Sequence, residues 1–149
     1  MKKALKPKLT PPLKILIVED YEPLWFFIAL WLAKAGGFDL QFESSGDGAL
    51  KAYGNGGPYD IVLTDLVHPG PNGLELARVM RQENPKQAIA MLTGCTSGSE
   101  LRSCQQLRIP VRAKPCVGED LIRLLEMALA IQKKKAGKKT VKQRKGMRV

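Results

Sequence analysis

The 149-residue chain has few of the residues that build disulfide frameworks or zinc sites, with three cysteines and one histidine. Cys95, Cys104 and Cys116 form no CxxC pair, and their odd number argues against a disulfide framework. A zinc site would lack ligands, because His68 is the single histidine. We therefore expect reduced, mostly buried cysteines, and a solvent-facing His68 in the turn that contains it.

Long apolar runs are also missing. No run approaches the ~18 residues that span a membrane. The apolar stretch that follows the basic N-terminus, Leu13–Val18, is too short for a signal-peptide core and ends in two acidic residues. These features predict a cytoplasmic protein. The length and the 44% apolar content fit one domain with a full hydrophobic core.

Acidic residues are absent from both ends of the chain, and these ends account for the net charge of +10. Residues 1–14 carry five lysines and residues 131–149 carry nine lysines or arginines, while the interval between them has a net charge of −4. This asymmetry predicts a flexible basic arm over residues 1–12, a globular domain over residues 13–131 and a flexible cationic tail over residues 132–149.

The tail, which includes the basic stretch 133–148, contains no aromatic side chain, so base stacking cannot contribute to its binding. No DNA-reading module fits in this length. The tail is either a solvated segment that aids solubility, or it binds nucleic acid, an anionic membrane surface or an acidic partner in a salt-sensitive way. We expect the preceding helix to end near Lys134 and at the latest at Gly137.

Five short apolar segments alternate with five helical segments, which predicts a doubly wound α/β fold with a five-stranded parallel sheet. The expected strands are Ile15–Val18, Asp39–Glu43, Asp60–Leu66, Ala88–Thr93 and Val111–Lys114. The expected helices are Pro23–Ala35, Asp47–Tyr53, Leu74–Glu83, Ser97–Gln106 and Glu119–Lys134.

Polar side chains follow the predicted strands where parallel sheets bind ligands, at the carboxyl edge. Glu19 and Asp20 follow the first strand, Asp65 the third, Thr93 the fourth and Lys114 the fifth. Clustered carboxylates repel one another unless a cation neutralises them. Mg²⁺ prefers a few carboxylates together with water and a phosphoryl oxygen. The pattern therefore predicts a magnesium site at this edge.

The same residues suit phosphoryl transfer to a carboxylate. Asp65 can act as the nucleophile and form an aspartyl phosphate. Mg²⁺, the Lys114 ammonium group and the Thr93 hydroxyl would neutralise the oxygens of the transferred group. Gly94 leaves the approach to Asp65 open. Any one of these residues alone would be read as a solvated strand end, and only the joint arrangement indicates chemistry.

From Leu13 to about Ile131 the sequence resembles the receiver domains of two-component response regulators. The resemblance is carried by the acidic pair after ILIV, by the aspartate with proline four and glycine eight residues later, by the threonine in AMLTG and by the Lys-Pro dipeptide. These positions are Glu19, Asp20, Asp65, Pro69, Gly73, Thr93, Lys114 and Pro115.

The resemblance implies a flavodoxin-like (βα)5 fold and a role for each matching residue. Asp65 would be the phosphoacceptor, Asp20 a direct Mg²⁺ ligand, Glu19 a ligand through water and the Val67 backbone carbonyl a third protein ligand. Thr93 and Lys114 would contact the phosphoryl group, and the Lys114–Pro115 bond would be cis. The partner would be a histidine kinase or phosphotransfer protein. The chain would be a signalling switch with output through protein contacts, not an enzyme.

Two departures from the family pattern affect the switch. The position three residues before the conserved lysine is commonly an aromatic residue that swings inward on activation in receivers, but here it is Val111, which has no ring to swing. Val67 and Cys95 occupy places where polar side chains can position the water that hydrolyses the phosphate. Neither is a strong hydrogen-bonding group, so our hypothesis is a long-lived aspartyl phosphate.

The first predicted helix, PLWFFIALWLAKA, is apolar almost all the way round. An all-round apolar helix is either buried or an interface. Because receivers have no layer outside this helix, we expect an interface with a second copy, with a kinase or phosphotransfer helical bundle, or with the terminal arms. The expected core-facing residues are Leu24, Phe27, Ile28 and Trp31, and the expected outward residues are Trp25, Phe26, Ala29 and Leu30.

Two other function classes compete with the switch. Hydrolases of the haloacid dehalogenase type use similar chemistry, but they place the nucleophile after the first strand in a DxD motif, which this chain lacks. A nucleic-acid-binding protein would use the receiver only to control exposure of the cationic tail. A receiver that never accepts phosphate is disfavoured, because every residue of the acceptor site is present.

Overall fold

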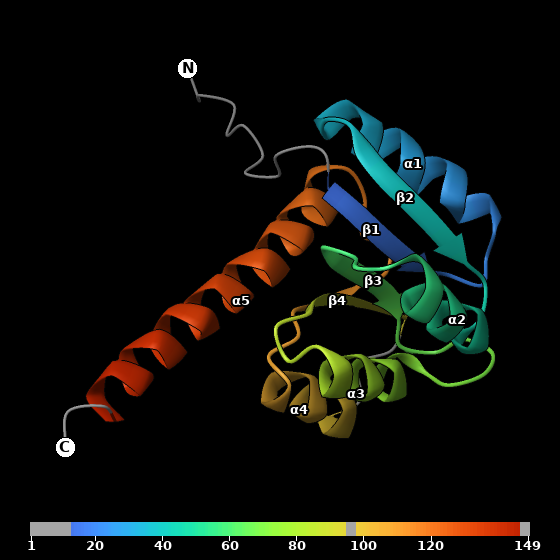
Figure 1. Ribbon diagram of the computed structural model, residues 1–149. Coiled ribbons are helices and arrows are strands. Elements are labelled where there is room, and N and C mark those ends of the chain that lie inside the picture. Colours follow the sequence, from blue (N-terminus) through green and yellow to red (C-terminus); the bar gives the residue numbers. More distant parts are fainter. Residues whose placement is uncertain (1–12, 95–97, 147–149) are drawn as a thin grey trace.

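The computed structural model describes residues 13–94 and 98–146, with side chains as far as residue 132 (Figure 1). Five parallel strands form one sheet in the order β2-β1-β3-β4-β5. The strands are β1 Leu13–Val18, β2 Phe38–Glu43, β3 Ile61–Asp65, β4 Ala88–Thr93 and β5 Val111–Ala113. The helices are α1 Pro23–Ala35, α2 Gly46–Gly56, α3 Gly73–Glu83, α4 Gly98–Gln106 and α5 Glu119–Gly146. The predicted doubly wound α/β fold is confirmed.

The central strands are continuously buried because both faces of the sheet are covered. Every residue of β3 and β4 is buried, and so are the last four residues of β1. Side chains alternate between the two faces, and each set packs into its own core. Burial of one such Ile or Leu side chain contributes about 1.5–3 kcal/mol, so these strands set the stability of the domain.

The two hydrophobic cores show which helices cover which face. Side chains of α1 and α5 pack on one face of the sheet, with Ile28, Leu32 and Leu124 among them. Side chains of α2, α3 and α4 pack on the other, with Ala49 and Met80 among them. The sheet thus forms the middle of three layers, with helices on both of its faces.

The parallel register brings the predicted site residues to that edge. Asp65, the last residue of β3, pairs with Leu92 of β4, and Thr93, the last residue of β4, pairs with Ala113. The backbone N–H of Lys114 donates to the Thr93 carbonyl oxygen over 2.8 Å. The strand ends therefore lie side by side, although they are far apart in the sequence.

The start of α3 closes the loop that follows Asp65. A capping box fixes it, because the Asn72 side chain accepts from the Glu75 backbone N–H (3.0 Å) and the Glu75 side chain accepts from the Asn72 N–H. The N–H of Gly46 at the start of α2 donates to the Pro69 carbonyl oxygen over 2.9 Å. Two helix starts therefore hold this loop.

The bounds predicted for Pro23–Ala35 and Ala88–Thr93 are confirmed, and most others differ by a few residues. The expected end of the last helix is wrong, since α5 continues past Gly137 to Gly146 and extends away from the sheet (Figure 1). Residues 1–12 lie outside the described residues, as do the side chains of 133–148. The division into arm, domain and tail, and binding through the cationic stretch, stay predictions.

The predicted faces of α1 are partly wrong. Phe27, expected in the core, is 49% exposed, while Trp25, expected on the outer side, is half-buried. The exposure expected of Phe26 and Leu30 is confirmed. The helix sits over the edge pair β1 and β2, so its buried stripe, centred on Ile28 and Leu32, is narrow. In the part of the chain that the structure describes, no helix has the length and apolar character needed to cross a membrane.

Candidate functional site

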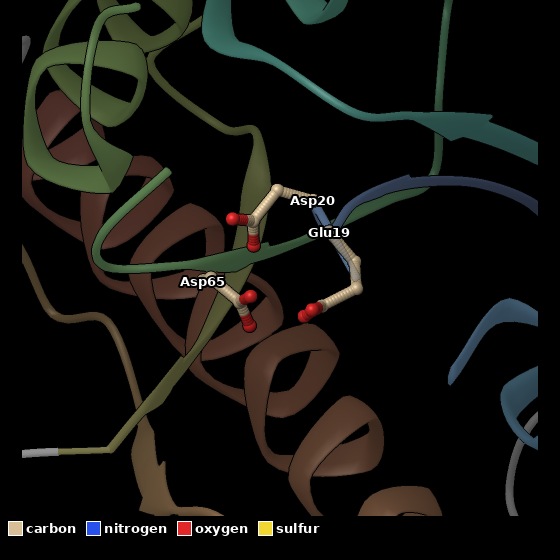
Figure 2. Close-up of side chains that lie close together, drawn as sticks. All are labelled: Glu19, Asp20 and Asp65. Carbon is tan, nitrogen blue, oxygen red and sulfur yellow. The ribbon is translucent and has the colours of Figure 1, made fainter. Parts of the chain in front are cut away.

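Three carboxylates converge at the carboxyl edge of the sheet. Glu19 and Asp20 follow β1 directly, and Asp65 ends β3. One oxygen from each lies within 4.8 Å of the others, and Figure 2 shows the three side chains pointing toward one another. Glu19 and Asp65 are buried, whereas Asp20 is exposed. The structure thus brings together the three acidic residues that the sequence predicted.

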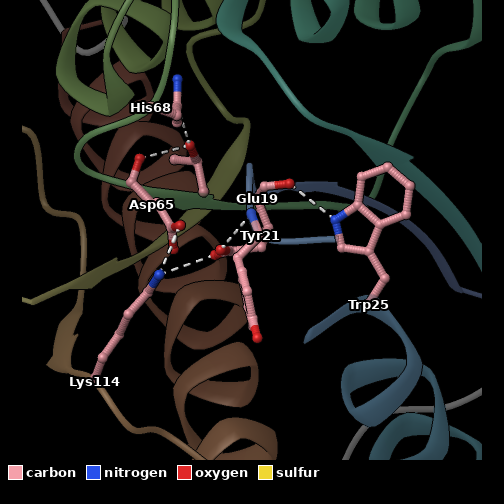
Figure 3. Close-up of polar contacts among 7 residues, drawn as sticks. Glu19, Tyr21, Trp25, Asp65, His68 and Lys114 are labelled. Atoms are coloured by element: carbon pink, nitrogen blue, oxygen red, sulfur yellow. Dashed lines mark hydrogen bonds and ion pairs between the residues drawn. The ribbon is translucent and has the colours of Figure 1, made fainter. Parts of the chain in front are cut away.

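Lys114 bridges the two buried acids. Its ammonium nitrogen Nζ lies 2.7 Å from Asp65 Oδ2 and 3.0 Å from Glu19 Oε2 (Figure 3). The lysine follows β5 and reaches across β4 to β3 and β1, which requires the strand order that the sheet has. The predicted cis Lys114–Pro115 bond is confirmed, and Gly57–Pro58 is a second cis bond. A single cation therefore partly neutralises two carboxylates.

The electrostatics of these groups reflect their burial and their crowding. Burial, together with the adjacent Glu19 carboxylate, raises the pKa of Asp65 to about 8, although Lys114 opposes this shift. Burial also favours a higher pKa for Glu19, but hydrogen bonds with Asp65, Lys114 and the Tyr21 backbone N–H outweigh it and lower that pKa. Burial works against the charged form of Lys114, yet its contacts with Asp65 and Glu19 raise its pKa.

A pocket of about 370 Å³ opens above Asp65. Besides Asp65 its lining includes Thr93, Gly94, Glu100 and Lys114. A β-carbon on Gly94 would meet no atom within 4 Å, so the entrance beside Thr93 is open, as predicted. Glu100 was not predicted at this site. The signal for it was its place in the first turn of α4, which starts after the loop that leaves the carboxyl edge. The full lining is Asp65, Leu66, Val67, Leu92, Thr93, Gly94, Glu100 and Lys114.

Residues 15–126 match the family model described as the response regulator receiver domain. The chain belongs to this family. The residues that the structure gathers at one edge all lie within the family model, namely Glu19, Asp20, Asp65, Thr93 and Lys114. The resemblance noted from the sequence is therefore confirmed, and so is the flavodoxin-like receiver fold.

Two curated relatives differ in how much of their own length aligns with this chain. PilH of Pseudomonas aeruginosa is 30% identical over 120 residues, which cover 78% of this chain and 98% of PilH. The response regulator ArlR of Staphylococcus saprophyticus is 43% identical over 81 residues, but these cover 54% of this chain and 35% of ArlR. The chain thus aligns with about a third of ArlR.

Solved structures show the same fold. A receiver domain from Clostridium thermocellum superposes with a TM-score of 0.72 at 24% identity, over 81% of this chain and 97% of that chain. The chemotaxis protein CheY4 of Vibrio cholerae gives 0.69 at 24% identity, over 79% and 99%. At these identities the likeness establishes the architecture of the receiver, while the roles of its residues rest on its own geometry.

His68 has a different position from the one predicted. It is 7% exposed instead of solvent-facing, and its Nε2 lies 3.0 Å from Thr64 Oγ1. The Thr64 hydroxyl also donates to the Asp65 carbonyl oxygen over 2.9 Å, and His68 Nδ1 lies 3.4 Å from the Pro69 carbonyl oxygen. Figure 3 shows the two contacts of the Thr64 hydroxyl beside the Asp65 side chain. His68 therefore ties the loop after β3 to the backbone of Asp65.

Trp25 is a second residue whose role the sequence did not reveal. Its indole Nε1–H donates to the Glu19 backbone carbonyl oxygen over 2.8 Å (Figure 3). Its ring stacks on Phe42 with centroids 5.2 Å apart. The Glu19 backbone N–H donates to the Glu43 carbonyl oxygen. The backbone N–H and the backbone carbonyl of Glu19 are therefore both hydrogen-bonded, which holds one carboxylate of the acidic cluster in place.

The structure also places two predicted valines and two of the three cysteines. Val67 is 75% exposed in the loop after Asp65 and lines the pocket. Val111 is half-buried and packs against the core beneath α4, so no aromatic ring occupies that place in the receiver. Cys104 and Cys116 are free and buried, as predicted. Cys95 lies outside the described residues.

Proposed function

We propose that this receiver is a signalling switch that accepts a phosphoryl group on Asp65 from a histidine kinase or phosphotransfer protein. The observation that carries the proposal is the position of Asp65. Its carboxylate lies in an open pocket and touches Lys114, while two further carboxylates stand within 4.8 Å. We also propose that the chain transmits its state through protein contacts and is not an enzyme.

The residues present fit a bound Mg²⁺ ion. The three carboxylates offer oxygen donors, which this cation prefers. Asp65 Oδ1 is buried and finds no hydrogen-bond partner among the residues that the structure describes, which is a costly arrangement unless a cation completes it. Asp20, Asp65 and the Val67 carbonyl would hold the ion directly, and Glu19 would hold it through water. When bound, Mg²⁺ would neutralise the crowded carboxylates and the charge on the phosphoryl oxygens.

The proposed reaction moves one phosphoryl group between two side chains. A carboxylate oxygen of Asp65 attacks the phosphorus atom of a phosphohistidine, the new P–O bond forms, and the P–N bond breaks. The histidine nitrogen keeps the bonding pair and takes up a proton from solvent. Attack requires the ionised carboxylate, which Lys114 favours through its contact of 2.7 Å with Asp65 Oδ2.

We expect Lys114 and Thr93 to contact the transferred group. The Lys114 ammonium already touches Asp65, so a phosphoryl group on Asp65 would form beside a positive charge. Thr93 is buried at the neighbouring strand end and lines the same pocket. Both side chains can therefore contact phosphoryl oxygens after a small movement, and this contact would distinguish the phosphorylated state.

The lifetime of the aspartyl phosphate is a further part of the proposal. Val67 lines the pocket with an apolar side chain, so it cannot orient a hydrolytic water. Together with Cys95 this favours slow hydrolysis. We expect the Val67→Asn, Cys95→Glu double substitution to speed the loss of phosphate. An unchanged decay rate in that variant would remove the basis for a long-lived phosphate.

The proposal is tested by the intact mass of the protein after incubation with Mg²⁺ and acetyl phosphate. We expect one phosphoryl adduct that is lost at alkaline pH, is absent with EDTA and is absent in Asp65→Asn. The Asp60→Asn variant, which alters an exposed aspartate at the far end of β3, is the matched control and should be labelled normally. An adduct of equal yield in Asp65→Asn would overturn the proposal.

A further inference from the structure

The two carboxylates that follow β1 are held in different ways. The Glu19 side chain is fixed at both oxygens, since Oε2 lies 3.0 Å from Lys114 Nζ and Oε1 accepts from the Tyr21 backbone N–H over 3.1 Å. The Asp20 side chain is exposed and forms no hydrogen bond or ion pair with any residue that the structure describes. Yet one oxygen of Asp20 lies within 4.8 Å of oxygens of Glu19 and Asp65. Its place in this acidic cluster is therefore set by the backbone that carries it.

Trp25 bonds to that backbone. The carbonyl of Glu19 and the N–H of Asp20 belong to one planar peptide unit. The Trp25 indole Nε1–H donates to this carbonyl oxygen over 2.8 Å, so it fixes the plane from which the Asp20 side chain departs. Figure 3 shows Glu19 between Lys114 and Trp25, with the lysine at its carboxylate and the indole at its backbone. The indole thus acts on Asp20 through the peptide that precedes it.

The indole itself is held by two elements. It is half-buried, and its ring stacks on Phe42 of the edge strand β2 with centroids 5.2 Å apart. The Trp25 backbone N–H donates to the Glu22 carbonyl oxygen over 2.9 Å in the first turn of α1. The residue after Phe42 is Glu43, whose carbonyl oxygen accepts from the Glu19 N–H over 2.9 Å. A helix start and a strand therefore fix this part of the backbone together, as the outer shell of a metal site does for its ligands.

We propose that Trp25 is a positioning residue for Mg²⁺, because its indole N–H holds the Glu19–Asp20 peptide in the orientation that places the Asp20 carboxylate in the acidic cluster. The inference rests on the proposed function, since it takes Mg²⁺ as the ion of this site and Asp20 as a direct ligand. A preorganised ligand loses less freedom on binding, so the affinity for Mg²⁺ falls when the hydrogen bond is removed. The coupling is reciprocal, so bound Mg²⁺ strengthens the hydrogen bond in return.

Titration of the full chain with MgCl₂, followed by backbone amide cross-peaks in ¹H–¹⁵N NMR spectra, measures this effect. Trp25→Phe keeps an aromatic ring for Phe42 but removes the indole N–H, and it should raise the dissociation constant for Mg²⁺ roughly three- to tenfold. Trp31→Phe makes the same change on the same helix, and the Trp31 indole forms no hydrogen bond within the described part of the chain. This matched control should bind Mg²⁺ like wild type. Equal dissociation constants in wild type and Trp25→Phe overturn the proposal.

An isosteric replacement separates the hydrogen bond from the packing of the ring. The amino acid benzothienylalanine has nearly the shape of tryptophan but carries sulfur in place of the indole N–H. In the Trp31→Phe background it replaces Trp25 alone, since the chain has two tryptophans. The substituted protein should bind Mg²⁺ as weakly as Trp25→Phe. An affinity equal to that of the Trp31→Phe parent would show that only the packing matters, and the proposal would be wrong.

The indole resonances test the reciprocal effect. Each of the two tryptophans contributes one indole N–H cross-peak, and the Trp25 peak is the one missing from the spectrum of Trp25→Phe. In wild type that peak should shift with MgCl₂ and give the same dissociation constant as the backbone amides, while the Trp31 peak stays in place. A Trp25 peak that does not move while the amides titrate refutes this inference and leaves the proposed metal site intact. If wild type binds no Mg²⁺, the metal site and the inference are both wrong.

Discussion

Gly73 stands so close to Asp65 that a β-carbon at residue 73 would lie 2.6 Å from the Asp65 backbone carbonyl oxygen. The same glycine donates its backbone N–H to the Leu66 carbonyl oxygen over 2.9 Å. The first residue of α3 is therefore pressed against the end of the strand that carries Asp65. This contact explains in steric terms why a glycine eight residues after the aspartate belongs to the pattern.

Substitution of Gly73 by alanine should lower the free energy of unfolding by about 1–3 kcal/mol, because backbone atoms cannot move aside cheaply. The matched control is Gly54→Ala in α2, where a β-carbon would meet nothing within 4 Å. That variant should be more stable by about 0.5–1 kcal/mol through helix propensity. Urea unfolding measures both. Equal effects at the two positions would contradict the steric account.

The buried pair Thr64 and His68 should be energetically coupled. His68→Leu removes the ring partner of the buried Thr64 hydroxyl, and Thr64→Val removes the hydroxyl partner of the His68 ring nitrogen, so each should cost about 1–2 kcal/mol of stability. The double variant should cost less than the sum of the two, by about 1 kcal/mol. Urea unfolding of the four proteins gives the coupling. Strict additivity would mean that the hydrogen bond contributes nothing.

Mg²⁺ should stabilise the folded receiver. A ligand that binds the native state alone adds about 2.7 kcal/mol at a concentration one hundred times its dissociation constant. Melting temperatures in Mg²⁺ and in EDTA should therefore differ for wild type. Asp20→Asn should reduce the difference sharply, because Asp20 supplies an exposed carboxylate of the acidic cluster. Asp47→Asn, a change to an acid outside the cluster, is the control and should respond like wild type.

Loss of Lys114 should weaken the metal-free protein. Lys114→Gln leaves the Glu19 and Asp65 carboxylates together without a cation, and should cost about 2 kcal/mol of stability in EDTA. The cost stays below that of a fully buried pair, because Lys114 is partly exposed. Addition of Mg²⁺ should recover part of the loss.

The control for Lys114 is Arg123, which pairs on the surface with Glu119 and Asp120. Arg123→Gln should change the stability by less than about 0.5 kcal/mol, since exposed ion pairs contribute little. Urea unfolding in EDTA compares the two variants. Equal losses would show that the bridge between the buried acids is no more important than a surface pair.

Much of the acceptor site could be predicted because strand ends in a parallel sheet converge. Because β3, β4 and β5 are neighbouring parallel strands, Asp65, Thr93 and Lys114 have to meet at one edge of the sheet. What the strand pattern leaves open is side-chain direction in the loops. His68 lies in a segment dense in turn residues. Its buried ring contacts the hydroxyl of Thr64, four residues earlier in β3.

The orientation of α1 and the length of α5 were harder to predict for two other reasons. An all-apolar helix has no polar face to fix its rotation, so the half-buried position of Trp25 is set by Phe42 and the Glu19 carbonyl, which belong to other elements. In α5, Gly137 costs only about 1 kcal/mol relative to alanine, and the alanine and lysine residues around it favour a helix.

The central claim, that Asp65 accepts the phosphoryl group, is tested most directly by reductive trapping. Borohydride reduces an aspartyl phosphate to homoserine and releases phosphate, and leaves unmodified carboxylates intact. Tandem mass spectrometry of protein treated with Mg²⁺ and acetyl phosphate should then locate homoserine at position 65 alone. Trapping at Asp20 or at Glu19, or no trapping in protein that carries a phosphoryl adduct, would contradict the assignment.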